Sequence, residues 1–153
     1  MDWLEFRRRF TREPATMLTI NRRTQDDVVI GAESLSLAEL RDIAVDGRPA
    51  RLTDDPDQLR KLESAAALVE KAVNEAWPIY GVTTGFGGMA NVPVHRDQAA
   101  LSQNNLLSFL ATGCGAPVDR RHVRAAMVLR ANVLMRGCSG VRLELVDRLV
   151  RFC

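Results

Sequence analysis

An amphipathic pattern over residues 55–76 constrains the fold of this chain more than any other feature. Asp55 and Pro56 stand in the arrangement of a helix N-cap followed by proline at the first helical position. Apolar side chains then recur at three- and four-residue steps, at Leu59, Leu62, Ala66, Val69, Val73 and Ala76. Pro78 cannot continue a helix. The sequence therefore predicts one long helix that buries one face and ends before residue 78.

Shorter patterns along the rest of the chain predict a mainly α-helical fold with a little strand. Ser36 and Glu39 have the spacing of a capping box, which predicts a helix to about residue 45 with Gly47 as its stop. A short strand is predicted at residues 28–30 and a loop at residues 89–96. Three further helices are predicted: one at residues 97–112, one that begins after an N-cap at Asp119, and one that begins after an N-cap at Ser139.

The chain divides into two regions of different composition. Residues 1–26 are polar and basic without a sustained period, so we interpret them as an N-terminal extension. Residues 27–153 carry the periodic patterns and form the domain. The last helical pattern reaches Cys153 with no glycine, asparagine or proline to end it. We expect from this that the chain is truncated within a longer protein.

Composition argues against several classes of partner. The net charge is only +2 and aromatic residues make up 5%, which disfavours nucleic acid and anionic membranes. No run of about 18 apolar residues is present to span a membrane. The three cysteines show no CxxC spacing, which favours free thiols and a cytoplasmic protein. His95 and His122 have no neighbouring ligand set, so we predict no metal site.

The segment Tyr80-Gly-Val-Thr-Thr-Gly-Phe-Gly-Gly88 directly follows the long helix and contains the only tyrosine of the chain. Its glycines predict a loop in which a ligand can approach the backbone. The glycine spacing does not fit a phosphate-binding motif, and no lysine follows. From composition alone, a flexible surface loop and a loop that carries a proton-transferring phenol remain equally open interpretations.

This segment resembles the signature loop of the aromatic amino acid ammonia-lyase and aminomutase family. The resemblance extends to Leu106-Leu-Ser-Phe-Leu-Ala-Thr-Gly113, which is similar to the substrate-selectivity helix of that family. It also includes Val128-Leu-Arg-Ala-Asn-Val-Leu-Met-Arg-Gly-Cys-Ser-Gly-Val-Arg142, and covers roughly residues 27–153. The likeness is greatest to bacterial phenylalanine ammonia-lyases. It implies the N-terminal part of the helical ammonia-lyase fold, with a glycine-rich lid loop.

The resemblance also implies roles for residues of the loop. The family uses an electrophilic prosthetic group, 4-methylideneimidazol-5-one (MIO), which captures the substrate amine. Tyr80 matches the base that removes the β-proton of the substrate, a role that requires the phenolate to be stabilised by positive charge or hydrogen bonds. Gly87 matches a position where the backbone passes close to the substrate. The remaining residues of the implied lid are Gly81, Gly85, Phe86 and Gly88.

By the same resemblance, Phe109 and Leu110 match the residue pair that selects the aromatic ring. An apolar pair suits an unsubstituted phenyl ring, whereas a buried phenol would lack a hydrogen-bond partner beside Phe109. Leu106 lies one helical turn before Leu110 and is expected to line the same pocket. Without the resemblance, the spacing of Phe109 and Leu110 would favour an ordinary hydrophobic core.

The chain departs from the family in one respect, because it contains no Ala-Ser-Gly triad from which MIO could form. Cys138-Ser139-Gly140 is similar to such a triad, but Ser139 is better interpreted as a helix N-cap. The resemblance implies that the triad lies beyond Cys153.

The resemblance therefore implies the N-terminal segment of a homotetrameric enzyme that converts L-phenylalanine to trans-cinnamate and ammonia. The alternatives are a phenylalanine 2,3-aminomutase, or a catalytically inactive fragment with a role in folding or assembly.

Overall fold

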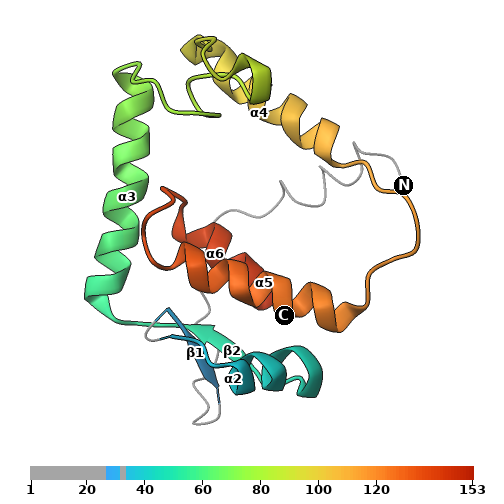
Figure 1. Ribbon diagram of the computed structural model, residues 1–153. Helices are drawn as coiled ribbons and strands as arrows, with labels where there is room; N and C mark the ends of the chain where they lie inside the picture. The colour runs from blue at the N-terminus through green and yellow to red at the C-terminus, as the bar shows by residue number, and fades with distance from the viewer. Residues whose placement is uncertain (1–26, 32–33) are drawn as a thin grey trace, which may run out of the picture.

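The computed structural model describes residues 27–31 and 34–153 and is mainly α-helical (Figure 1). Its elements are β1 (Val28–Ile30), α2 (Leu37–Arg41), a π-helical segment (Asp42–Asp46), β2 (Ala50–Leu52), α3 (Pro56–Asn74), a 3-10 turn (Gly87–Met89), α4 (Arg96–Leu110), α5 (Arg120–Leu134) and α6 (Leu143–Arg151). This confirms the predicted fold class, a helical chain with a short strand. The predicted N-terminal extension, residues 1–26, lies outside the described residues.

The first part of the domain is a small parallel βαβ unit. β1 pairs with β2 in the register Val28↔Ala50 and Ile30↔Leu52. Hydrogen bonds from Val28 N to Pro49 O, and from Thr53 N to Ile30 O, extend the pairing at both ends at 2.9 Å each. The sequence analysis missed β2, because three residues with an arginine at the centre carry no strand pattern of their own. The crossover through α2 brings them beside β1.

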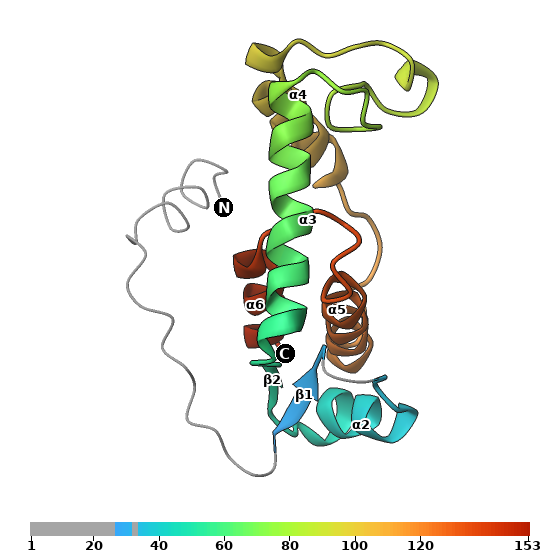
Figure 2. The same ribbon diagram turned by 90° about the vertical axis from the view of Figure 1, so that its left-hand side faces the viewer.

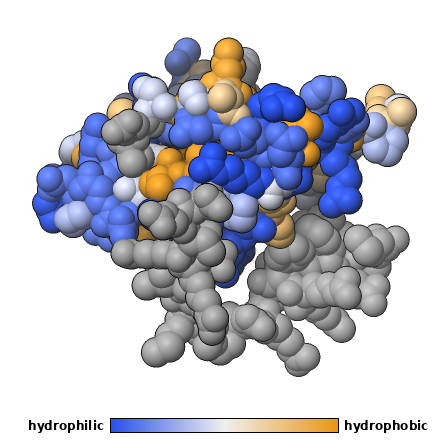
Figure 3. Space-filling model, turned by 90° about the horizontal axis from the view of Figure 1, so that it is seen from below, coloured by the Kyte–Doolittle hydropathy of each residue, from blue (hydrophilic) through white to orange (hydrophobic). Residues whose placement is uncertain are grey.

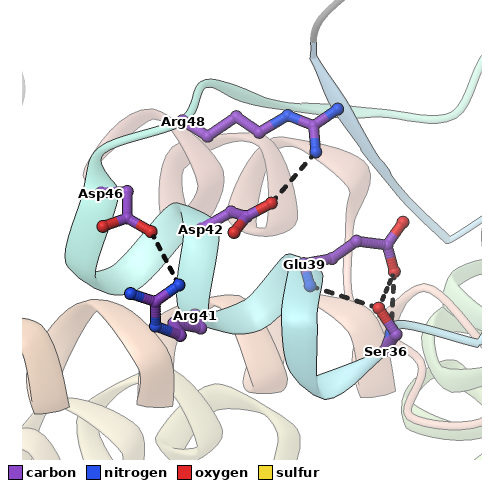
Figure 4. Close-up of polar contacts among 6 residues, drawn as sticks. All are labelled: Ser36, Glu39, Arg41, Asp42, Asp46 and Arg48. Carbon is purple, nitrogen blue, oxygen red and sulfur yellow. Dashed lines mark hydrogen bonds and ion pairs between the residues drawn. The ribbon is translucent and has the colours of Figure 1, made fainter.

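The capping box that begins α2 forms as predicted (Figure 4). Ser36 Oγ accepts a hydrogen bond from Glu39 N at 3.2 Å, and the Glu39 carboxylate accepts one from Ser36 N at 2.8 Å. The hydrogen bond from the Ser36 hydroxyl, followed by the one from its backbone, lowers the pKa of Glu39. The helix continues through the π-helical segment, which was not predicted, and ends at Gly47 in the left-handed conformation.

The hydrophobic core lies where α5 and α6 pack against the sheet and the lower part of α3 (Figure 2). Ile30, Ile43, Leu62, Val128 and Val146 are almost completely buried there. Gln58 on α3 donates a side-chain hydrogen bond to Met135 O and so fixes α3 against the end of α5. Where the described residues are visible from below, the surface is mostly hydrophilic, with apolar side chains at a few places (Figure 3).

Helix α3 connects this core with the glycine-rich segment. Asp55 is its N-cap as predicted and accepts a hydrogen bond from Asp57 N at 3.0 Å. The helix ends at Asn74, so Ala76 is not part of the apolar stripe but adopts the left-handed conformation with φ 55°. Trp77 N then donates to Ala72 O at 2.8 Å, which closes the helix end. Figures 1 and 2 both place the glycine-rich segment and α4 beyond this end of α3.

The beginning of α6 corrects one prediction. Asp119 is the N-cap of α5 as expected, but Ser139 does not cap α6. The N-cap is Arg142, which makes no side-chain capping hydrogen bond, and the helix begins at Leu143. The residues between Gly137 and Val141 instead pass along α3, where Gly140 lies against Val69.

Among the described residues, no helix combines the length and the apolar character that crossing a membrane requires.

Candidate functional site

The segment after α3 has a defined shape that is built by hydrogen bonds to a few groups. Ile79 O accepts hydrogen bonds from the backbone N–H groups of Val82, Thr83 and Thr84 at 3.0, 3.0 and 3.2 Å. The Thr83 hydroxyl accepts from Ile79 N at 2.7 Å and donates to Trp77 O. Thr83 and Thr84 are both buried. The two threonines therefore hold the loop in its shape. The sequence analysis did not assign them this role, although two adjacent β-branched polar residues between glycines could have indicated it.

The second half of the segment folds back on the first. Val94 N donates to Thr83 O at 2.8 Å, and Gly85 N donates to Val92 O at 3.0 Å. Thr84 and Pro93 form an isolated antiparallel bridge. The predicted loop at residues 89–96 is thus tied to the residues that follow Tyr80, and it leads directly into α4.

Tyr80 projects from this framework with 65% of its surface exposed. Its phenol oxygen accepts a hydrogen bond from Gly87 N at 3.3 Å. Gly87 has φ +54° and no atom within 4 Å of the position that a β-carbon would occupy. Two of the predicted site residues therefore meet directly.

An open groove of about 500 Å³ lies between the loop and α4. Phe86, Leu101, Leu106 and Phe109 contribute its apolar surface. Its polar side chains are Gln98, Ser102 and Asn105. The groove brings together three predicted site residues, Phe86 from the loop and Leu106 and Phe109 from α4.

Leu110 does not line this groove, although we predicted that it shares a pocket with Leu106. Phe109 and Leu110 are 76% and 63% exposed, so neither belongs to the hydrophobic core of the described residues. The alternative interpretation of this pair as ordinary core does not hold in this structure.

The remaining loop residues make close contacts within the segment. The Phe86 ring lies against Gly81, with Cε1 2.9 Å from the position of a β-carbon there. Gly85 is packed in the same way against Met89, whereas Gly88 has open space beside it. From α4, Gln103 Nε2 donates a hydrogen bond to Gly81 O at 2.6 Å. Gln103 was not among the predicted site residues.

The residues of this chain do not provide a precursor of MIO. Gly140 of Cys138-Ser139-Gly140 has φ +62° and packs against α3, so the segment is a structural turn at the beginning of α6. His95 is used as the N-cap of α4, where Nδ1 accepts from Asp97 N at 3.4 Å, and His122 lies on α5. In the part of the chain that the structure describes, no three His, Cys, Asp or Glu side chains gather in a possible metal site.

Sequence comparisons relate the chain to known enzymes. The family described as "Aromatic amino acid lyase" matches residues 35–153. The phenylalanine ammonia-lyase of Nostoc punctiforme is 46% identical over 125 residues, which are 82% of this chain and 22% of that protein. The histidine ammonia-lyase of Symbiobacterium thermophilum is 40% identical over 82% of this chain and 24% of its own length. The chain thus spans about a quarter of the length of these relatives.

The structural comparison agrees with this relationship. The phenylalanine aminomutase of Pantoea agglomerans superimposes with a TM-score of 0.72 and 30% sequence identity, over 83% of this chain and 24% of the aminomutase. The match includes enzymes named for phenylalanine and for histidine, and both lyases and aminomutases. These comparisons place the fold and the sequence in one group of carbon–nitrogen lyases and related mutases: the chain belongs to the aromatic amino acid lyase family.

Proposed function

We propose that this chain supplies the general base and part of the ring pocket of a phenylalanine ammonia-lyase. The observation that carries the proposal is the exposed phenol of Tyr80, whose oxygen faces the Gly87 amide at 3.3 Å on a loop anchored by buried threonines. An exposed phenol on a fixed backbone can reach a substrate.

In the proposed reaction, Tyr80 removes a proton from the β-carbon of L-phenylalanine. The electron pair of that C–H bond forms the Cα–Cβ double bond of trans-cinnamate, and the amino group leaves as ammonia. In this family, MIO makes the amine a leaving group. Because the described residues do not fit that group, we derive no step through it, and we propose that its Ala-Ser-Gly precursor is supplied by residues outside this sequence.

The groove beside the loop supports phenylalanine as the substrate. Phe86, Leu106 and Phe109 present apolar surface to it, which suits an unsubstituted phenyl ring. An imidazole or phenol ring would bring polar atoms that these three side chains cannot hydrogen-bond, so such a ring would have to reach Gln98, Ser102 or Asn105 on the same groove. The 46% identity to a phenylalanine ammonia-lyase, against 40% to a histidine ammonia-lyase, points in the same direction.

A phenylalanine 2,3-aminomutase is the second candidate. The similarity in fold to the Pantoea agglomerans phenylalanine aminomutase favours it, because both enzymes would need the same base and the same apolar pocket. A mutase returns the ammonia to the β-carbon, so the two candidates differ in product and not in the residues described above.

The test is a product assay on a protein that contains this chain together with an Ala-Ser-Gly segment. L-Phenylalanine should yield trans-cinnamate and ammonia in equal amounts. β-Phenylalanine as the main product would establish the mutase, and turnover of L-histidine in preference to L-phenylalanine would refute the proposed substrate. Sequencing of the coding region that follows Cys153 gives a separate check, because the proposal requires the triad there.

The proposal includes a cytoplasmic homotetramer. Exposed apolar side chains on α4, among them Leu107 and Leu110, support association with further protein surface. Light scattering of the catalytically active protein measures its mass, and a monomeric active enzyme would contradict this part of the proposal.

A further inference from the structure

Helix α4 and the Tyr80 loop are joined by very few polar contacts. Figures 1 and 2 show α4 beside the loop and away from the α5–α6 pair. Among the hydrogen bonds of the described residues, only the one from Gln103 Nε2 to Gly81 O links α4 with residues 78–90. At 2.6 Å this bond is short for an amide donor and a carbonyl acceptor. The start of α4 is attached to the loop through residues 92–94, which are hydrogen-bonded to Thr83 and Gly85, and Gln103 adds a second attachment two helical turns further along α4.

The acceptor of this bond is the residue next to the proposed base. Gly81 has φ +71°, and its N–H donates to Thr84 Oγ1 at 3.3 Å. Both polar backbone groups of Gly81 are thus bound by side chains, Thr84 from within the loop and Gln103 from 22 residues away. The Gly81 N–H belongs to the peptide that joins Tyr80 to Gly81, and Gly81 O belongs to the next peptide. Together the two bonds hold the backbone on both sides of Gly81, directly after the residue that carries the phenol.

The donor is equally well placed with respect to the ring pocket. Gln103 and Leu106 are three residues apart on α4 and lie on one side of the helix. Leu106 lines the groove together with Phe86, whose ring packs on Gly81. One helix face therefore carries a pocket residue, Leu106, and the one α4 side chain that hydrogen-bonds the backbone of residues 78–90 in the described part of the chain.

We propose that Gln103 is a positioning residue, which holds the loop against α4 through Gly81 and thereby sets Tyr80 relative to the groove of Phe86, Leu106 and Phe109. The catalytic meaning of this role rests on the proposed function of Tyr80, whereas the structural link does not. A carbonyl oxygen can only accept, so residue 103 must provide a donor. A side chain of the same size and polarity that lacks a hydrogen-bond donor does not satisfy this requirement.

Three variants separate the donor from the size of the side chain. Gln103→Met keeps a similar shape without a donor. Gln103→Glu keeps the shape but places an ionised acceptor beside Gly81 O near neutral pH, and becomes a donor only when its carboxyl is protonated. Gln103→Lys restores a donor on a long side chain. Asn104→Met serves as the matched control, because Asn104 is exposed on the same helix and does not line the groove.

Hydrogen–deuterium exchange of the chain measures the link without any enzyme activity. In Gln103→Met and in Gln103→Glu near neutral pH, we expect the amides of residues 82–85 to exchange roughly fivefold faster, the effect of losing one hydrogen bond. Gln103→Lys and Asn104→Met should remain within about twofold of the wild type. The glutamate variant should regain slow exchange, after correction for intrinsic rates, below a pH of about 4. Unchanged exchange in both Gln103→Met and Gln103→Glu near neutral pH would overturn the link. If Gln103→Met does not fold, the exchange of Gln103→Glu alone tests the link.

Kinetics of the active protein test the positioning role. Gln103→Met should lower kcat roughly tenfold with KM for L-phenylalanine changed less than about twofold, because a misdirected base affects the proton transfer more than substrate binding. Gln103→Lys should restore most of kcat, which a general packing defect would not allow. Faster loop exchange with an unchanged kcat would overturn the positioning role. Faster loop exchange in a protein with no lyase or mutase activity would refute the proposed function and leave the link intact.

Discussion

Gly140 packs directly against Val69, so closely that a β-carbon at Gly140 would overlap Val69 Cγ2. The contact joins the turn before α6 to the middle of α3. This turn contains Cys138-Ser139-Gly140, the segment whose sequence is similar to an MIO precursor. Gly140 also has φ +62°, a conformation that L-residues adopt at a cost. The requirement for glycine at this position is therefore structural, and it arises from both the backbone and the packing.

Replacement of Gly140 by alanine should lower the free energy of unfolding by about 2–4 kcal/mol, since backbone strain and overpacking add. The matched control is Gly115→Ala, because Gly115 has φ +90° but no atom within 4 Å of its β-carbon position. It should lose only about 1–2 kcal/mol from strain. Urea unfolding of both variants measures the difference. Equal losses would show that contact with Val69 adds nothing.

Ala76→Gly should raise the free energy of unfolding. Ala76 is an exposed residue with φ 55°, in the position that ends α3 and that glycine normally occupies. Relief of this strain exceeds the entropy that glycine adds to the unfolded chain, so we expect a gain of about 0.5–1 kcal/mol. The same substitution at exposed Ala67, within α3, should instead cost about 1 kcal/mol. A loss in Ala76→Gly by thermal unfolding would contradict the expected strain.

Tyr80→Phe should abolish turnover in the active protein and leave the chain folded. The substitution removes the oxygen that faces the Gly87 amide but keeps the ring, and general base catalysis contributes about 10²–10⁴-fold to a rate. Because Tyr80 is largely exposed, the thermal unfolding midpoint should hardly change. Steady-state kinetics and circular dichroism measure the two quantities. Turnover within tenfold of the wild type would rule out Tyr80 as the base.

Phe109→His should move substrate preference from phenylalanine toward tyrosine. Phe109 lines the groove and offers no partner to a phenol hydroxyl, whereas histidine supplies one. A hydrogen bond that satisfies a buried hydroxyl is worth about 1–3 kcal/mol, so the ratio of kcat/KM values should change roughly 5- to 150-fold. Phe109→Leu is the control, because it alters the pocket without adding a polar group. A similar gain for tyrosine in both variants would show that size alone sets the preference.

Asp119 gives α5 a stability that depends on pH. Its side chain accepts hydrogen bonds from Arg121 Nη2 at 2.8 Å and from Arg121 N at 2.8 Å, and these hold the pKa of Asp119 well below its usual range. A carboxyl with a lowered folded pKa contributes stability above its unfolded pKa of about 3.9, and this contribution is lost as the pH falls toward the folded value.

Asp119→Ala should therefore lower the unfolding midpoint more at a pH of about 7 than at a pH of about 2, below the unfolded pKa. Asp119→Asn should lose less at neutral pH, because asparagine also caps helices. Thermal unfolding followed by circular dichroism at the two pH values measures both effects. A deficit in Asp119→Ala that is independent of pH would contradict the role of the carboxylate charge.

Local sequence patterns were sufficient for the parts of the fold that depend on neighbouring residues. Asp55, Asp119 and the Ser36–Glu39 pair cap helices through hydrogen bonds that span two or three positions, so their patterns predicted three helix beginnings correctly. The Tyr80 loop and the residues around Phe109 were also sufficient to indicate the family, which the comparisons confirmed.

The features that join distant segments became visible only in the folded chain. β2 pairs with β1 after the crossover through α2. The N-cap of α6 is not Ser139 but Arg142, three residues later, and the neighbouring Gly140 packs on Val69 of α3. The same holds for the site, where Phe86 meets the groove of α4 and Gln103 binds Gly81 across 22 positions. Local patterns carry no signal for such contacts, because their energy appears only after the chain has brought the two partners together.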